Sequence, residues 1–160
     1  MSAASRKLLI DEYLFVEAFG RDINFYDSYS QSVHLDLETS NLLWVYDDDE
    51  NAYMEAGIPP EENAGIRQRV ETSPDRYLEI PGLDHGDHHD ILREFLNSEW
   101  TDDEDARLWA SQADFGSIGG WKQAVDDESI VQAYYDFRDL KTTEMAEEFL
   151  RSHGIEPDWK

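Results

Sequence analysis

A strand–turn–strand pattern at residues 32–46 constrains the fold more than any other feature of the sequence. In SVHLDL (32–37), the apolar Val33, Leu35 and Leu37 alternate with polar residues, as in a strand that is buried on one face. The turn formers ETSN follow, and LLWVY then supplies a second apolar run. Two such runs joined by a short turn predict a β-hairpin.

A third strand and an N-terminal helix are predicted to pack with this hairpin. RYLEIP (76–81) has the composition of a strand, and Pro81 ends it. Residues 5–19 carry apolar side chains at helical spacing, and Gly20 can end that helix. NFYDSYSQS (24–32) is interpreted as a polar connection rich in turn formers.

Residues 47–74 are predicted to form a long surface loop, in which a short helical turn could occur. They have no sustained hydrophobic period and contain the pair Pro59–Pro60. The run DDDEN (47–51) at their start is interpreted as solvated, because charge runs are usually exposed.

The C-terminal half is predicted to be helical. Residues 87–98 form one helix, and Thr101–Glu104 reads as a capping box that starts the next. Ser117 opens a third helix, and a last one runs over 127–153 to a left-handed cap at Gly154. The fold class expected is therefore α+β: a small antiparallel sheet packed with an N-terminal helix and a C-terminal helical half. At 160 residues, a single domain over 1–160 is expected.

The charge of the chain limits its partners. Thirteen Lys and Arg stand against 37 Asp and Glu, a formal net charge of −24. Such a surface repels phosphate backbones and anionic lipids, so direct binding to nucleic acid or membranes is disfavoured. Three explanations stay open: adaptation to a high-salt cytoplasm, an acidic surface for a basic partner, or ordinary acidity. The absence of cysteine excludes disulfides and thiolate chemistry, and no apolar stretch is long enough to span a membrane, so a soluble cytoplasmic protein is expected.

Three segments together resemble a bacterial family known as an uncharacterised protein family, number zero-one-five-eight of its series. They are HLDLETSNLLWV, DRYLEIPGLD, and the tail that runs from DFGSIGGWKQAV to EEFLRSHGI, and they lie in order over about residues 33–155. Ser40-Asn41 stands where that family usually ends its turn with Thr-Gly, Gly119-Gly120-Trp121 replaces Ala-Phe-type residues, and Tyr134 stands where tryptophan is usual. The resemblance implies a soluble bacterial α+β protein and brings no established activity or catalytic residue.

The run DHGDHHD at residues 84–90 is a candidate metal site. On a helix, His85 and His89 are four residues apart and could share an ion with Asp84, Asp87 or His88. The zinc-protease motif fails, since Gly86 stands where glutamate is required. If Asp87 caps the helix, His85 lies outside it and the four-residue geometry is lost. The favoured interpretation is therefore a capped helix start.

The acidic run at residues 47–51 resembles part of a calcium-binding loop. Asp47, Asp49 and Asn51 fit the first three ligand positions, but Ala52 and Ile58 replace the required glycine and glutamate, which excludes an EF-hand. A phosphotransferase pair, Asp47 with Asp49, would need a large parallel sheet that the strand pattern cannot build.

The tail WKQAV…AYYDFRDL holds the candidate binding residues. Trp121, Lys122, Tyr135 and Arg138 could present an aromatic and basic patch, although aromatic residues at helical spacing usually pack in a core. No nucleophile motif is present, and no cofactor is expected.

The leading hypothesis is a non-catalytic, acidic, cytoplasmic protein-interaction module. One alternative is a nucleic-acid-mimicking inhibitor of a basic protein, with surrogate phosphates at Asp47–Glu50, Glu61–Glu62, Asp102–Asp105 and Asp126–Glu128. The other is a metal-dependent hydrolase centred on Asp84, His85, His88 and His89.

Overall fold

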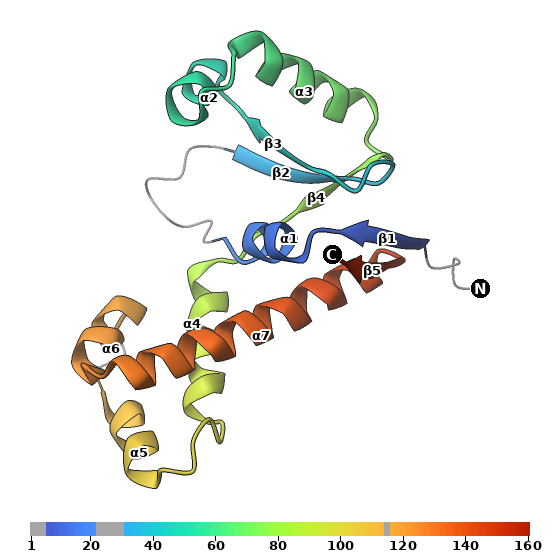
Figure 1. The fold of residues 1–160 in the computed structure, drawn as a ribbon. Helices are drawn as coiled ribbons and strands as arrows, with labels where there is room; N and C mark the ends of the chain where they lie inside the picture. The colour runs from blue at the N-terminus through green and yellow to red at the C-terminus, as the bar shows by residue number, and fades with distance from the viewer. Residues whose placement is uncertain (1–5, 22–30, 114–115) are drawn as a thin grey trace. The chain divides into compact units, whose positions relative to one another are not determined.

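The computed structural model describes residues 6–21, 31–113 and 116–160 (Figure 1). Most of the polar connection predicted at 24–32 lies outside these ranges. Within them the strands are β1 (Arg6–Ile10), β2 (Gln31–Asp36), β3 (Leu42–Tyr46), β4 (Tyr77–Ile80) and β5 (Ile155–Trp159). The helices are α1 (Glu12–Phe19), α2 (Asp49–Ala56), α3 (Pro60–Thr72), α4 (His85–Leu96), α5 (Glu104–Gln112), α6 (Ile118–Val125) and α7 (Glu128–Ser152).

The predicted antiparallel sheet is confirmed. β2 is central and pairs with β3 on one side and β4 on the other, in the order β3-β2-β4. Val33 pairs with Trp44 and with Ile80, and Leu35 pairs with Leu42 across the hairpin. Val33, Leu35 and Ile80 are fully buried on one face of the sheet. His34 and Asp36, on the other face of β2, are buried as well, so this strand is covered on both faces and not on one as the alternation predicted. The α+β class is therefore correct.

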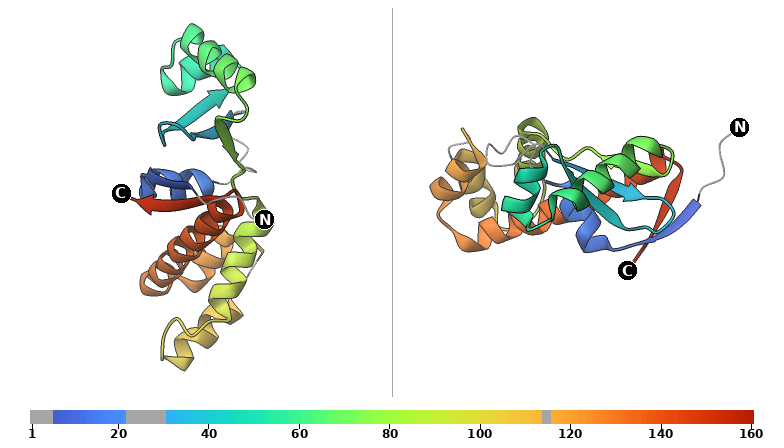
Figure 2. Two further views of the ribbon diagram at one scale, coloured as in Figure 1. Left: turned by 90° about the vertical axis from the view of Figure 1, so that its right-hand side faces the viewer. Right: turned by 90° about the horizontal axis from the view of Figure 1, so that it is seen from above.

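The helix predicted at 5–19 is wrong in its first part. Residues 6–10 form β1, which pairs in parallel with β5 near the C-terminus (Figures 1 and 2), and only Glu12–Phe19 is helical. Asp11 separates the two elements and caps α1 by accepting a hydrogen bond from the Leu14 N–H at 2.9 Å. The parallel pairing joins segments about 150 residues apart in the chain, so local spacing carried no sign of it.

The loop predicted at 47–74 is also wrong, because two helices occupy it. Pro60 stands at the start of α3, where its missing N–H costs nothing, and Glu61 and Glu62 follow in the first turn. The helix is polar on most of its surface, with Asn63 buried against the end of β3. Tertiary hydrogen bonds rather than an apolar stripe therefore hold it.

Two predicted helix caps move by a few residues. α4 begins at His85, and its N-cap is Asp84, not Asp87; the two carboxylates form a reciprocal capping box, with bonds of 2.8 and 3.1 Å. α5 is capped by Asp103, which accepts from the Ala106 N–H, so the capping box predicted at Thr101–Glu104 is not formed. The predictions of Ser117 as the cap of α6 and of the left-handed Gly154 after α7 are confirmed.

The chain divides into two compact units. Unit 1 comprises residues 1–82 and 146–160, and unit 2 comprises residues 83–145. In unit 1, Phe15 contacts Trp159, and Phe19 contacts Phe149, at ring centroid distances of 5.9 and 5.6 Å. The single domain expected from the length stays a prediction beside this division. Among the described residues, no helix is long and apolar enough to cross a membrane.

Unit 2 is built around a cluster of aromatic rings. The ring centroid of Phe95 lies 6.1 Å from that of Trp121 and 5.7 Å from that of Tyr134, and the centroids of Trp121 and Tyr134 are 5.5 Å apart. All three pairs of rings meet edge to face. The three side chains are buried, and the Trp121 indole donates to the Ala110 carbonyl at 2.9 Å. These rings join α4, α5, α6 and α7.

Candidate functional site

The histidine cluster lies at the start of α4. Because Asp84 is the N-cap, His85 falls inside the helix, and it shares a face with His89 one turn later. Asp84 and Asp87 are engaged in capping, and His88 and His89 are half-buried. Within the residues that the structure describes, no group of three or more His, Asp or Glu side chains is placed to hold a metal ion.

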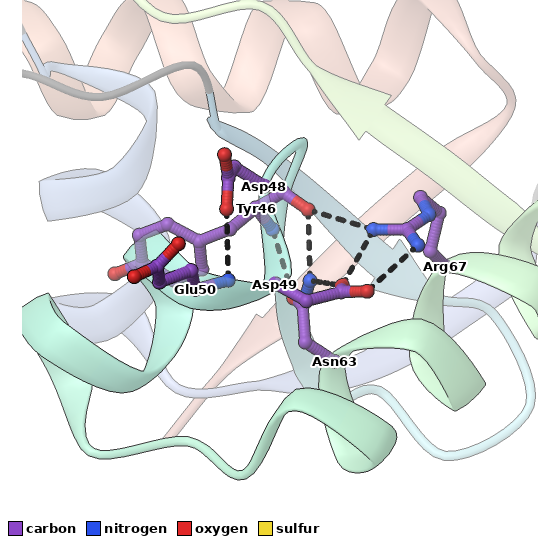
Figure 3. A network of polar contacts seen from close by, with 6 residues as sticks. All are labelled: Tyr46, Asp48, Asp49, Glu50, Asn63 and Arg67. Atoms are coloured by element: carbon purple, nitrogen blue, oxygen red, sulfur yellow. Dashed lines mark hydrogen bonds and ion pairs between the residues drawn. The ribbon is translucent and has the colours of Figure 1, made fainter.

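The acidic run after β3 takes part in a clamp between elements (Figure 3). The side-chain amide of Asn63 accepts from the Tyr46 N–H at 3.0 Å and donates to the Tyr46 carbonyl at 2.9 Å, so it pairs with β3 as a neighbouring strand would. It also donates to Asp49 at 2.7 Å, and Arg67 binds the same carboxylate at 2.8 and 3.3 Å. The clamp joins the end of β3, the start of α2, and α3.

Asp49 in this clamp is not the solvated carboxylate that the sequence predicted. The hydrogen bonds from Arg67 and Asn63 lower its pKa, and the Asp49 carboxylate in turn raises the pKa of the Arg67 guanidinium. Asp48 accepts from the Glu50 N–H at 2.8 Å and so supports the first turn of α2. These contacts assign a structural role to the run.

Three of the four candidate binding residues lie together in unit 2. Lys122 donates to the Tyr135 hydroxyl at 2.8 Å and lies 5.0 Å from its ring centroid. The Arg138 guanidinium lies 4.9 Å from the same ring, and it is 3.7 Å from Asp139. Trp121 is fully buried and belongs to the aromatic core rather than to this patch.

Strand β2 brings together a serine and a histidine that the sequence analysis did not pair. Ser32 Oγ lies 2.9 Å from His34 Nε2, and burial lowers the pKa of His34. Glu79, the cross-strand partner of His34, raises this pKa, while Arg21 lowers it. The sequence did indicate this proximity, because Ser32 and His34 are two positions apart and residues at that spacing lie on the same face of a strand. Arg21 donates to the carbonyls of Ala18 and Ile80, so it ties this region together.

A depression of about 600 Å³ lies between α4 and α7 within unit 2. It is lined by Asp90, Arg93, Glu94, Asn97, Ser98 and Phe137. Arg93 pairs with Asp90 at 2.8 Å, and Glu94 pairs with Lys141 at 3.0 Å. Each charged side chain that lines the depression therefore has an ion-pair partner of opposite charge.

Among the described residues of unit 2, Trp109 on α5 is the most exposed aromatic side chain. Leu108 and Trp109 are 56% and 51% exposed, although the helix buries Ala110 beside them. The Trp109 indole donates to the Val125 carbonyl at 2.9 Å, which fixes the ring against the end of α6. Trp109 is thus both exposed and held in place, and tryptophan side chains of this kind are enriched at binding interfaces.

Carboxylates surround this apolar pair on two sides. Glu104 and Asp105 lie one helical turn before Leu108 and Trp109, and so on the same face of α5. Asp126 follows Val125 directly, with Asp127 and Glu128 behind it, and all three are exposed. We call the set of Leu108, Trp109, Asp102–Asp105 and Asp126–Glu128 the Trp109 surface. The sequence showed the acidic runs, but helical spacing alone could not tell which apolar side chains of α5 stay outside the core.

Unit 2 has no compensating positive charge of comparable size. Residues 83–145 contain five Lys and Arg and sixteen Asp and Glu. Asp127 accepts from the Ser129 hydroxyl at 2.6 Å, which lowers its pKa and keeps it ionised. Asp126 adopts a left-handed conformation, with φ of 46°, at the junction of α6 and α7. The negative field is therefore built into fixed backbone positions.

Comparisons with known proteins add no further guide to the site. The sequence matches no protein-family model, no curated protein and no solved structure. A functional assignment therefore rests on the geometry and charge of the described residues alone.

Proposed function

We propose that this chain is a non-catalytic protein-interaction module whose Trp109 surface binds a basic protein segment that also carries apolar side chains. The single observation that carries the proposal is the exposed, hydrogen-bonded Trp109 beside two acidic runs. Tryptophan is among the residues that contribute most to binding energy, and its fixed ring loses little entropy on association.

The charge of the surface selects the partner. The carboxylates at Asp102–Asp105 and Asp126–Glu128 attract Lys and Arg and repel phosphates, which favours a basic protein over nucleic acid or an anionic membrane. The apolar pair at the centre favours a partner with leucine or aromatic residues among its cations. We propose further that the protein acts in the cytoplasm and that it is related to the uncharacterised bacterial family that its sequence resembles.

Nucleic-acid mimicry is the rival explanation. The capping roles of Asp103 and Asp127 at the starts of α5 and α7 weigh equally on both explanations. The apolar pair separates them, because a phosphate-like surface has no use for Leu108 and Trp109. Mimicry therefore predicts binding that ignores these two side chains.

Two peptides of equal charge test the proposal. One is an amphipathic Lys–Leu helix, and the other carries serine in place of each leucine. We expect the leucine peptide to bind at least about tenfold more tightly in a calorimetric titration, because only it covers the apolar pair. Equal affinity for the two peptides would overturn the proposal.

Variants locate the contact. Trp109→Ala and Leu108→Ser are each expected to weaken binding of the leucine peptide about tenfold or more. Leu140→Ser is the matched control, since Leu140 is also exposed, at 70%, but lies on α7 twelve residues, or roughly 18 Å, beyond Glu128. A loss of affinity in the control as large as that in Trp109→Ala would place the contact elsewhere.

A further inference from the structure

In unit 1, no strand among the described residues pairs with the outer edge of β1. Arg6 donates its N–H to the Gly154 carbonyl at 2.9 Å, and Ile10 accepts from the Lys160 N–H at 3.0 Å, so both face β5. In a parallel pair, alternate residues bond to the same neighbour. Lys7 and Leu9 therefore direct their N–H and C=O groups to the opposite edge.

That edge is open among the described residues. In the described part of the chain this sheet consists of β1 and β5 alone, and the Leu9 side chain is 51% exposed. The outer edge of β5 is different, because the same alternation turns Pro157 outward, and proline has no N–H to donate. Of the two edges, β1 is the one that can accept another strand.

The sequence of β1 and the start of α1 is complementary to itself in the antiparallel direction. RKLLIDE (6–12) has two cations at one end, two carboxylates at the other and three apolar residues between them. β1 ends at Ile10, Asp11 caps α1 and Glu12 begins it, so the two carboxylates lie just past the strand. If two copies are centred on Leu9, the Lys7 of each lies beside the Asp11 that follows the partner strand, and Arg6 approaches Glu12. Cross-strand pairs of opposite charge are favourable.

The bonding pattern fits the same register. The backbone N–H and C=O groups of Lys7 and Leu9 both point away from β5. The two copies of Leu9 can therefore exchange two hydrogen bonds across a twofold axis. The Asp11 side chain accepts from the Leu14 N–H at 2.9 Å, which keeps this carboxylate in place. Tyr13 and Leu14, 72% and 51% exposed, follow directly in α1 and extend the apolar surface.

We propose that β1 pairs antiparallel with β1 of a second copy of the chain, centred on Leu9, and so forms a four-stranded sheet in a homodimer. A lysine on an edge strand usually discourages pairing. Here Asp11, which directly follows the partner's β1, lies beside Lys7, so the charge selects another copy in this register. The inference concerns unit 1 and does not depend on the Trp109 surface.

Sedimentation equilibrium of the full chain tests the proposal through a charge exchange. Arg6→Glu and Glu12→Arg are each expected to raise the dimer dissociation constant at least about tenfold, because each places two like charges together in the homodimer. Mixing the two variants restores opposite charges at both positions, and we expect a heterodimer with an affinity close to that of the wild type.

Leu9→Pro is an independent variant. It removes an N–H that does not bond to β5, so we expect loss of the dimer with the fold retained by circular dichroism. A wild-type chain that stays monomeric at the highest concentration reached would overturn the proposal. So would a dimer that withstands Arg6→Glu, or a mixture of the two charge variants that fails to associate.

Discussion

Arg76 holds the carboxylate of Asp36 through two parallel hydrogen bonds, Nε to Oδ1 at 3.0 Å and Nη2 to Oδ2 at 2.9 Å. Asp36 ends β2, and Arg76 immediately precedes β4, so this pair fixes the junction of the two strands. The N–H groups of Glu38 and Thr39 also donate to Asp36 Oδ1, at 2.9 and 3.3 Å. The bond from Arg76 and these backbone donors lower the pKa of Asp36 to about 2.

This pair predicts a pH dependence of stability. The folded pKa lies below the ordinary value of 3.8, so Asp36 contributes fully above that value and its contribution is lost as pH falls toward 2. The shift corresponds to about 2 kcal/mol. Urea denaturation should therefore show Asp36→Asn destabilised by about this amount at pH 7, with the difference from wild type shrinking as pH falls to about 2. A difference that stays constant with pH would contradict the assignment. Glu17→Gln, on an exposed carboxylate of α1, serves as the control.

Asn63 is expected to be the most sensitive polar residue of unit 1. Asn63→Ala leaves the backbone groups of Tyr46 and the Asp49 carboxylate without their amide partner, and it removes a fully buried side chain. We predict a loss of about 2–4 kcal/mol in the free energy of unfolding. Gln68→Ala, on the exposed face of the same helix, should change it by less than about 0.5 kcal/mol. Equal effects of the two substitutions would show that the clamp does not stabilise the fold.

Two residues other than glycine adopt left-handed backbone conformations, within the ranges described, and both sit at turns. Ser40, with φ of 65°, closes the β2–β3 hairpin, and Asp126, with φ of 46°, follows α6. Ser40→Gly and Asp126→Gly should each raise the free energy of unfolding by about 0.5–1 kcal/mol, because glycine accepts this conformation without strain. Gly154→Ala is the reciprocal test: with φ of 74°, it should be destabilised by about 1 kcal/mol. Melting curves that show no gain for either glycine variant would argue against strain at these turns.

The two tryptophans of unit 2 are predicted to separate stability from binding. Trp121→Ala removes a ring in contact with Phe95 and Tyr134, and we expect a cost of about 3–5 kcal/mol. Trp109→Ala loses one hydrogen bond from a half-exposed ring and should cost about 1 kcal/mol. Thermal denaturation ranks the two, and similar melting temperatures would place Trp109 in the core.

Local patterns predicted the elements whose stability is local. The hairpin, β4 and the long α7 each carried their own period and end signals, such as Pro81 and Gly154, and all were found where expected. β1 was missed because its apolar residues suit a helix or a strand equally, and its partner β5 lies at the other end of the chain. Pairing between distant segments decided its structure.

Helices held mainly by polar contacts were also hard to predict from the sequence. α3 has little apolar periodicity, and its position depends on Asn63 and Arg67 reaching Tyr46 and Asp49. Pro60 followed by Glu61 and Glu62 is a helix start signal, but it lies in a segment already rich in acidic residues and was not recognised as one. In the same way, the spacing of residues in α5 predicted a helix but not that Trp109 would lie outside the core.

The salt dependence of peptide binding tests the central claim most directly. The Lys–Leu peptide is titrated into the wild type and Trp109→Ala at about 0.1 M and about 0.5 M salt, which shortens the screening length roughly twofold. Contact with the apolar pair predicts that both proteins bind less tightly at high salt, while the wild type keeps an advantage of about tenfold at each concentration, because apolar contacts are not screened. Equal affinities of wild type and variant, falling together with salt, would contradict the account and favour a purely electrostatic surface.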